Sequence, residues 1–316
     1  MIKEIHKVTT KLAMKLTGKK KNAQKYLKVI GKTLAFLSLL LPWRQRINFL
    51  YQTLGKESGF TDTKYYLNLG YWEPETNSLD QASENMARQL AEISQLGSTD
   101  RILDVGFGFA EQDFFWESTY QPDHIYGINL CESQVKEAQK RVKNAGLEKK
   151  IQLQLGNACK IDLASESVTK VFALECAMHF MPREAFLKEA YRVLKPGGQV
   201  VLADICGLSG SLTWQQRLIY QLALAFWQLP KDNMYPLATY KEKLKEAGFQ
   251  MASVESIKDK VYRPCFDYLL AKLADKTYSQ KFNIFYKYAA RWGLQFCQDH
   301  QACPFDYVLV KGLKAS

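Results

Sequence analysis

Residues 102–111 read ILDVGFGFAE, and this stretch decides which fold the chain adopts. An apolar run that holds a single carboxylate, Asp104, leads directly into Gly106 and Gly108. Glycine accepts backbone conformations that other residues avoid, so the run predicts a strand that ends in a tight turn. A helix that opens after the turn would direct its free N–H groups at a bound ligand. The stretch therefore predicts a ligand-binding turn between a strand and a helix.

The spacing of the glycines narrows the class of ligand. A nicotinamide dinucleotide turn follows the pattern G-x-G-x-x-G, whose third glycine lets helix and strand pack closely. Glu111 occupies that third position in this chain. The turn therefore disfavours a nicotinamide-dependent enzyme.

Helical and strand patterns alternate along the chain on both sides of this turn, from about residue 79 onward. Strands are predicted at residues 101–105, 125–128, 151–155, 169–174, 199–203, 251–257 and 307–310, with helical segments between most of them. Repetition of strand, helix and strand is typical of a mostly parallel sheet covered on both faces. We therefore predict an α/β fold, doubly wound around a seven-stranded sheet.

Four further motifs follow the glycine turn, and their order resembles that of a known enzyme family. They are GINLCESQ at residues 127–134, GNA at 156–158, VFALECAMHF at 171–180 and RVLKPGG at 192–198. Together they resemble the class I (Rossmann-like) S-adenosylmethionine-dependent methyltransferases of small molecules, especially sterol and sugar O-methyltransferases and cyclopropane fatty acid synthases. The resemblance covers about residues 64–258, and it implies a methyltransferase domain over residues 61–316.

The resemblance implies a binding site for the methyl donor, S-adenosylmethionine. Its residues would be Asp104, Gly106, Gly108, Ile128, Asn129, Gln134, Asn157, Ala158 and Leu174. Asn129 and Asn157 depart from the pattern, because many relatives carry acidic residues at both positions. An amide still accepts and donates hydrogen bonds, so donor binding is expected to survive both changes.

His179 is the expected catalytic base, because it follows the fourth strand at the edge where the donor methyl group should emerge. An imidazole with an ordinary pKa of about 6.5 suits proton transfer at neutral pH. A purely structural histidine under the turn at residues 180–181 is the alternative. If the acceptor is an alkene carbon, Glu175 and an aromatic roof would instead stabilise a carbocation. We favour a hydroxyl acceptor over nitrogen or carbon.

Aromatic residues outside the motifs have two possible roles. Tyr71 and Trp72 resemble a segment that closes over the donor as a lid, and the alternative is a buried pair that anchors the chain before the core. Helical insertions are expected at about residues 205–240 and 262–302. The aromatic side chains of the first, which include Trp214 and Tyr220, either form the roof of a lipophilic acceptor pocket or simply cover the sheet.

Residues 1–60 form a basic arm that carries the whole charge excess. They hold eleven Lys and two Arg against two Glu, while the rest of the chain is balanced. The first helix pattern sets lysines opposite an apolar face, and the apolar run at residues 34–41 is too short for a transmembrane helix of about 20 residues. We therefore expect contact with a membrane surface through residues 1–42. A nucleic-acid methyltransferase whose lysine arm binds phosphates is the disfavoured alternative.

The seven cysteines are scattered without any CxxC pair, which indicates a reduced compartment and a cytoplasmic protein. Cys297, His300 and Cys303 lack a fourth ligand, so no metal site is expected. A binding module that kept the fold but lost turnover is a second competing class. The sequence makes no prediction of the oligomeric state or of the identity of the acceptor.

Overall fold

The computed structural model describes residues 61–275, 291, 293–295 and 303–316. The arm expected at residues 1–60 lies outside the described residues, as does most of the segment 276–302. Within the described part of the chain, no helix is both long enough and apolar enough to cross a membrane.

Seven strands form one sheet in the order β3-β2-β1-β4-β5-β7-β6. Their bounds are β1 (Arg101–Val105), β2 (His124–Asn129), β3 (Ile151–Leu155), β4 (Val168–Leu174), β5 (Leu194–Gly207), β6 (Gln250–Ser256) and β7 (Phe305–Leu313). The pairs among β1 to β5 are parallel, whereas β7 runs antiparallel to both β5 and β6. The predicted seven-stranded, mostly parallel sheet is confirmed.

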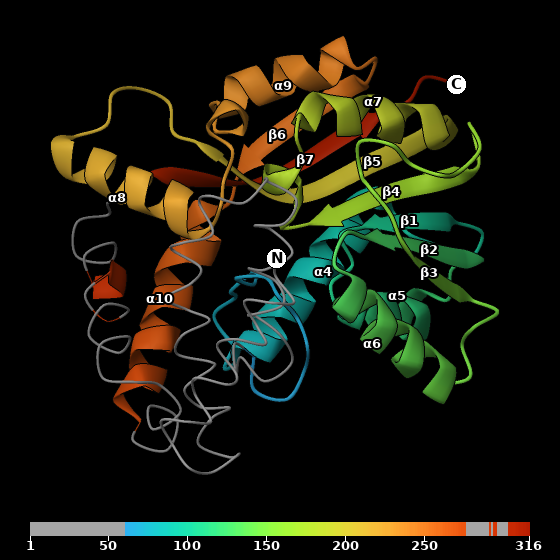
Figure 1. Ribbon diagram of the computed structural model, residues 1–316, viewed down its shortest axis with the longest axis horizontal. Coiled ribbons are helices and arrows are strands. Elements are labelled where there is room, and N and C mark those ends of the chain that lie inside the picture. Colours follow the sequence, from blue (N-terminus) through green and yellow to red (C-terminus); the bar gives the residue numbers. More distant parts are fainter. Residues whose placement is uncertain (1–60, 276–290, 292, 296–302) are drawn as a thin grey trace, which may run out of the picture.

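Helices cover both faces of the sheet (Figure 1). One face carries α4 (Leu79–Ser94), α5 (Glu111–Tyr120) and α6 (Glu132–Asn144), and the other carries α7 (Arg183–Val193) and α9 (Leu237–Glu246). Beyond the carboxyl ends of the parallel strands lie α8 (Trp214–Phe226) and α10 (Lys258–Ala274), which fall in the two expected insertions. Short 3₁₀ turns complete the fold: η3 (Ala177–His179) and η4 (Lys231–Asn233).

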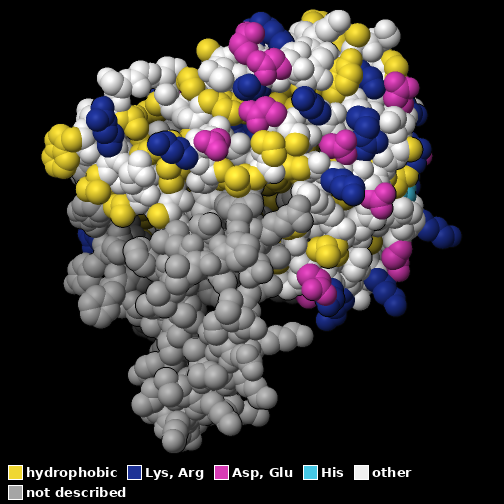
Figure 2. All heavy atoms as spheres, turned by 45° about the horizontal axis from the view of Figure 1, so that its top comes forward, with side chains coloured by type: hydrophobic (Ala, Val, Ile, Leu, Met, Phe, Trp, Pro, Cys, Tyr) yellow, Lys and Arg dark blue, Asp and Glu magenta, His cyan; other side chains and the backbone are white. Residues whose placement is uncertain are grey.

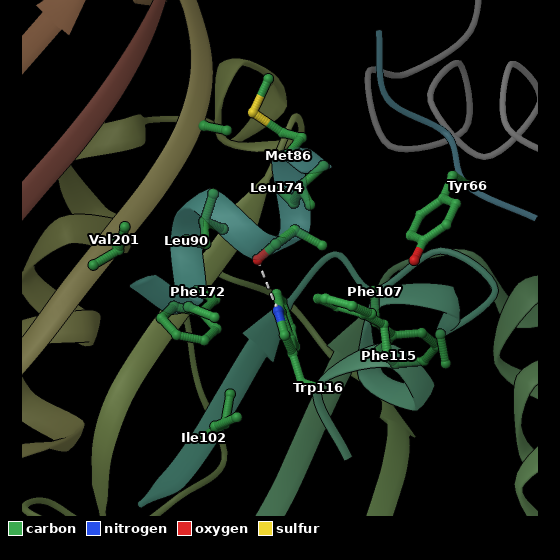
Figure 3. Close-up of a cluster of buried hydrophobic side chains, with 14 of the residues drawn as sticks. Tyr66, Met86, Leu90, Ile102, Phe107, Phe115, Trp116, Phe172, Leu174 and Val201 are labelled. Carbon is green, nitrogen blue, oxygen red and sulfur yellow. Dashed lines mark hydrogen bonds between the residues drawn. The ribbon is translucent and has the colours of Figure 1, made fainter. Parts of the chain in front are cut away.

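Aromatic side chains pack between α4, α5 and the sheet, next to the glycine turn (Figure 3). Trp116 of α5 is fully buried, its ring lies 4.8 Å from that of Phe172 on β4, and its Nε1 donates to the Ala87 carbonyl of α4 at 2.9 Å. A buried large apolar side chain contributes about 1.5–3 kcal/mol to stability. These contacts therefore hold α5 against α4 and β4.

Several strands are longer than the sequence predicted, and the fifth differs most. We expected the fifth strand at residues 199–203, but β5 begins at Leu194. Leu194 pairs with Val168 ahead of a shift in register, and Gly197 has a left-handed φ of 76°. The turn at residues 195–198 thus interrupts a longer strand. The sequence indicates the turn, but it does not indicate that β5 pairs with β4 both before and after it.

Candidate active site

A pocket opens at the carboxyl ends of β1, β2 and β4. Within the sheet, β2 lies on one side of β1 and β4 lies on the other, so the strand order reverses direction at β1. Ligands bind at such switch points in α/β sheets. Ten of the predicted site residues line this pocket: Gly106, Gly108, Ile128, Asn129, Gln134, Asn157, Ala158, Leu174, Glu175 and His179. Three others do not line it: Asp104, Tyr71 and Trp72.

The glycine turn brings the backbone to the pocket wall. Gly106 and Gly108 adopt left-handed φ values of 83° and 59°. A Cβ added to Gly106 would come within 2.7 Å of the Cys176 Sγ atom, and the Gly106 N–H donates to the Ile128 carbonyl at 2.7 Å. Only glycine fits this position, because any side chain meets both backbone strain and a packed neighbour.

Two amide side chains line the pocket after β2. The Asn129 Nδ2 donates to Gln134 Oε1 at 2.8 Å, which fixes the orientation of both groups. Gln134 Nε2 is buried and has no hydrogen-bond partner within the described residues. A buried donor of this kind normally binds something, so Gln134 fits a polar ligand such as the methyl donor.

Asn157 lines the pocket beside Ala158, where we expected the donor's adenine. Its Oδ1 already accepts the Cys159 N–H at 3.1 Å, which fixes the side chain from within its own turn. A carbonyl oxygen has a second lone pair, so this bond leaves Asn157 able to accept from a ligand as well.

Asp104 lies behind the pocket rather than in its wall. It is fully buried, and its Oδ2 accepts from Gln112 Nε2 at 2.8 Å. Gln112, which sequence reasoning missed, does line the pocket and also donates to the Phe107 carbonyl at 3.2 Å. The expected direct contact of Asp104 with the donor is therefore replaced by a contact of Asp104 with the glycine turn through Gln112.

Asp104 has an unexpected neighbour in Asp113 of α5. Both carboxyl groups are fully buried, and neither Asp113 oxygen has a hydrogen-bond partner within the described residues. Burial raises the pKa of Asp104 to about 7, and burial together with the charge of Asp104 raises the pKa of Asp113. Burial therefore favours the protonated form of Asp113 and brings the ionisation of Asp104 close to neutral pH.

Glu175 ends β4 in a left-handed conformation with a φ of 54°. Its Oε2 accepts from the Leu69 N–H at 2.8 Å and from the Tyr307 hydroxyl at 2.7 Å. Burial raises the pKa of Glu175 to about 7, and the two hydrogen bonds oppose that rise. A non-glycine residue held at positive φ is costly, and such residues cluster at functional sites.

His179 ends η3 and lines the same pocket with only 7% of its surface exposed. Burial lowers its pKa to about 4; a hydrogen bond to the Gln228 backbone opposes this shift, and the nearby charge of Arg183 adds to it. The imidazole is therefore neutral at pH 7, which is the state that a proton acceptor requires.

Tyr71 and Trp72 belong to the layer outside the pocket. The Tyr71 and Trp72 N–H groups donate to the Ala82 and Lys260 carbonyls, each at 2.8 Å, so the segment bridges α4 and α10. Trp72 packs on Tyr268 of α10 with the rings 5.2 Å apart. The segment is thus held between two helices, and neither Tyr71 nor Trp72 lines the pocket, while the lid role and the anchoring of the arm both stay predictions.

Residues just before this pair reach the pocket instead. Tyr65, Leu67 and Asn68 all line it, although sequence reasoning missed them. Tyr65 packs against Phe109 of the glycine turn with the rings 6.2 Å apart. The resemblance to a segment that covers the donor in the family could have pointed to these residues. It was placed on Tyr71 and Trp72, a few positions further along the chain.

Trp214 and Tyr220 of α8 lie away from the described pocket. Trp214 is 73% exposed, whereas Tyr220 stacks on Phe305 of β7 with the rings 5.3 Å apart. Neither residue lines the described pocket. Tyr220 thus covers part of the sheet and Trp214 meets solvent, while an aromatic roof over the acceptor stays a prediction.

The fold and the glycine-lined pocket define a Rossmann-like enzyme that binds a nucleotide-type ligand, and comparisons with known proteins identify its chemistry. Residues 103–202 match a methyltransferase domain model. The chain is 35% identical over 251 residues to erythromycin 3''-O-methyltransferase from Saccharopolyspora erythraea, covering 78% of this chain and 82% of that protein. It is 28% identical over 197 residues to 27-O-demethylrifamycin SV methyltransferase from Amycolatopsis mediterranei, covering 60% and 69%.

Solved structures share the fold at low sequence identity. Geranyl diphosphate C-methyltransferase from Streptomyces coelicolor A3(2) superposes with a TM-score of 0.68 at 14% identity, covering 87% of this chain and 99% of that one. The cyclopropane synthase MmaA2 from Mycobacterium tuberculosis superposes with a TM-score of 0.69 at 16% identity, again covering 87% and 99%. The chain therefore belongs to the class I S-adenosylmethionine-dependent methyltransferases, and it methylates a small-molecule acceptor.

Proposed function

We propose that this enzyme methylates a hydroxyl group of a lipophilic natural product, with His179 as the general base. The observation that carries the proposal is the placement of a neutral imidazole in the pocket that the glycine turn also lines. The names of the two relatives at 35% and 28% identity describe O-methylation of erythromycin and rifamycin compounds, which supports oxygen as the acceptor atom.

The described residues divide between holding the donor and handling the proton. S-adenosylmethionine supplies a methyl group on a positively charged sulfur when it is bound. The Gly106 to Gly108 backbone and the Gln134 amide would hold the donor, and Gln112 would keep the glycine turn in place. His179 would accept the acceptor's hydroxyl proton as the oxygen attacks. Positioning the two substrates in line in a water-poor pocket supplies the rest of the rate.

Carbon methylation is a second candidate, and Glu175 is the observation that favours it. Its carboxyl group lines the pocket beside His179 and is held by Tyr307. A carboxylate there would stabilise a positive charge that develops on an alkene acceptor. The two candidates differ in whether the reaction needs the imidazole.

Identification of the labelled product separates these candidates. The protein would be incubated with donor carrying a labelled methyl group and with matched acceptors that differ in one group: a macrolide glycoside bearing a free hydroxyl, its O-methylated form and an isoprenoid alkene. We expect label only on the free hydroxyl. Label on the alkene would favour carbon methylation, and donor binding without transfer to any acceptor would indicate a non-catalytic binding module.

We also propose that the enzyme contacts an anionic membrane surface from which it takes its acceptor. The basic arm supports this in sequence, since each Lys or Arg near an anionic surface contributes about 1 kcal/mol. The outer face of α8 supports it in structure, because Trp214, Leu218 and Leu222 recur every four residues and are 73%, 50% and 50% exposed. Figure 2 shows hydrophobic side chains gathered where α8 lies, and residues 205–231 contain no carboxylate.

Sedimentation with vesicles tests the membrane proposal. Replacing Lys3, Lys7, Lys11 and Lys15 by Gln is expected to abolish binding to vesicles that contain phosphatidylglycerol, and Leu218→Ser is expected to weaken it. Leu155→Ser is the matched control, because Leu155 is 56% exposed at the far edge of the sheet. Unchanged sedimentation of the lysine variant would contradict the proposal. Salt-sensitive binding to RNA but not to vesicles would favour the nucleic-acid alternative.

A further inference from the structure

Side chains from three different elements hold the backbone of η3, which carries His179. The Asp204 carboxylate of β5 accepts the Met178 N–H at 2.8 Å. The Asn233 Nδ2 of η4 donates to the Met178 and Phe180 carbonyls at 2.9 and 2.6 Å. These bonds fix the backbone on both sides of His179.

Arg183 of α7 ties these holding groups together. Its guanidinium donates to the Ala177 carbonyl at 3.3 Å, to the Asn233 carbonyl at 2.9 Å and to the Ile205 carbonyl at 2.9 Å. It also pairs with the Asp204 carboxylate at 3.2 Å, and neither side chain of the pair is exposed. Arg183 therefore contacts η3, η4 and β5 at once, and it supports both Asn233 and Asp204.

None of these three side chains lines the pocket, although all are buried directly behind it. Burying an ion pair costs solvation energy, and replacing such a pair by apolar residues is often neutral or stabilising. A stability role alone therefore gives little reason for an arginine and an aspartate here. What the pair does supply is a rigid set of directional bonds and a fixed positive charge next to the imidazole.

We propose that Arg183, Asp204 and Asn233, which we call the η3 clamp, are positioning residues that set the orientation of His179 and keep its imidazole uncharged. The inference rests on the proposed function of His179 as the base. The clamp touches neither the donor nor the acceptor, so it acts only through the turn that it holds.

The charges around His179 favour its neutral form. Arg183 lowers the pKa of His179, and the rings of Tyr235 and Tyr240 lie 4.9 and 4.6 Å from the guanidinium carbon. The carboxylate of Asp204, which would favour an imidazolium, is occupied by Arg183, the Met178 N–H and the Tyr240 hydroxyl. The Glu175 carboxyl group lines the same pocket as His179, and it accepts hydrogen bonds from the Leu69 N–H and the Tyr307 hydroxyl.

The neutral state matters because the donor sulfur is positively charged. An imidazolium at this position would repel the donor and could not accept the hydroxyl proton. Arg183 already has Asp204 as a partner, so its charge bears on His179 without being free to approach the substrates. The clamp thus combines a mechanical and an electrostatic function in one buried group.

Nuclear magnetic resonance titration of His179 tests the electrostatic function without any turnover. The chain has four histidines, and the His179 signal is assigned by its loss in His179→Ala. Arg183→Gln is expected to raise the pKa of His179 above about 4 and to move the acid limb of the kcat profile to higher pH. Arg183→Lys keeps the charge and should titrate like the wild type.

A matched control is available on the same helix. Arg192 of α7 also donates to backbone carbonyls, those of Ile161 and Leu163 at 2.8 Å each, and pairs with Glu189. Arg192→Gln is expected to leave the titration of His179 unchanged. An unchanged titration in a folded Arg183→Gln protein, or an equal shift in Arg192→Gln, would overturn the electrostatic part of the proposal.

Asn233→Ser tests the mechanical function and leaves both buried charges in place, so it can be read even if Arg183→Gln fails to fold. We expect kcat to fall about tenfold or more, because a displaced catalytic group loses its alignment with the acceptor, while the Kd of the donor stays unchanged. In a His179→Ala background the same substitution should have no further effect on turnover.

Two outcomes of this second test would overturn the positioning role. One is a normal kcat in folded Asn233→Ser, and the other is an equal loss with and without His179. Near-normal turnover of His179→Ala by itself would instead remove the proposed base, and the titration of His179 would still show whether Arg183 acts on it. The failure of the inference and the failure of the proposed function are thus distinguishable.

Discussion

The two sides of the pocket are built by different means. The donor side, around β1 and β2, uses glycine backbone and neutral amides such as Asn129 and Gln134. Its buried acidic pair, Asp104 and Asp113, lies behind the wall, and burial raises the pKa of both carboxyl groups. The side formed by β4 and η3 instead buries a full ion pair, Arg183 with Asp204, and leaves Glu175 and His179 in the wall.

The difference follows from what each side must do. A donor shared by a whole family needs a shape that backbone can supply, and backbone at a glycine turn approaches a ligand more closely than side chains can. Moving a proton needs groups whose protonation states are set by burial and by fixed charges. Shape requirements are local in sequence, whereas charge requirements are met by residues brought together from distant elements.

The largest expected effect is the loss of donor binding in Gly106→Val. A side chain there meets a φ of 83° and the Cys176 sulfur at 2.7 Å, so the turn must move away from the pocket. Calorimetry with S-adenosylmethionine measures the loss. Gly210→Val is the control, because Gly210 has a φ of 94° with nothing within 4 Å of its added Cβ. Unchanged binding by folded Gly106→Val would mean that shape does not govern the donor side.

A smaller but still large effect is expected on the other side of the pocket. His179→Ala should lower kcat by about 10²- to 10⁴-fold, the usual contribution of general acid–base catalysis, and leave donor affinity nearly unchanged. His124→Ala is the matched control, since His124 starts β2 at the opposite end of the sheet and burial also lowers its pKa. Near-normal turnover in His179→Ala would assign the chemistry to Glu175 or to an acceptor that needs no base.

The smallest effect concerns stability and compares the two buried acidic sites. The folded pKa of Asp104, about 7, lies above its ordinary value of 3.8, so the native state holds protons that the unfolded chain has released. The free energy of unfolding therefore falls as the pH rises through this window. Asp104→Asn should recover about 1–3 kcal/mol above the window, because it removes the buried carboxylate that ionises there.

Asp204→Asn should have the opposite sign, since it leaves the buried Arg183 without its counter-ion, a change that costs about 3–5 kcal/mol. Urea denaturation of both variants below and above the pH window measures the difference. If Asp104→Asn destabilised the protein as strongly as Asp204→Asn, the contrast between a buried acidic pair and an ion pair would be wrong.

The sequence predicted the part of the pocket around β1 and β2 better than the part around β4 and η3. The first part depends on local patterns, and the second depends on residues that are distant in sequence. The positions of the strands, the glycine turn and the positions of Asn129 and Gln134 follow from patterns within ten residues of one another or from a family resemblance. Tyr307 reaches Glu175 across 132 positions, and Asn233 reaches Met178 across 55. No local pattern marks such contacts, because the topology of β5 and β7 creates them.

The aromatic residues ahead of the core illustrate a second limit. Tyr71 and Trp72 carry the right chemistry for a lid, but their backbone pairs with α4 and α10, and this pairing fixes which way the side chains face. A shift of a few residues decides whether Tyr65 or Tyr71 meets the pocket. Sequence identified the segment, and tertiary pairing selected the residues within it.

The position of β7 in the sheet has a consequence for biosynthesis. This strand follows β6 in the chain but lies between β5 and β6, and among the described strands β6 pairs with β7 alone. Until the ribosome has made residues 305–313, β5 presents an open edge and β6 has nothing to pair with, which is the kind of surface on which chains aggregate. Tyr307 reaches Glu175 only when this strand inserts, so a nascent chain can form the glycine turn before Glu175 has this partner.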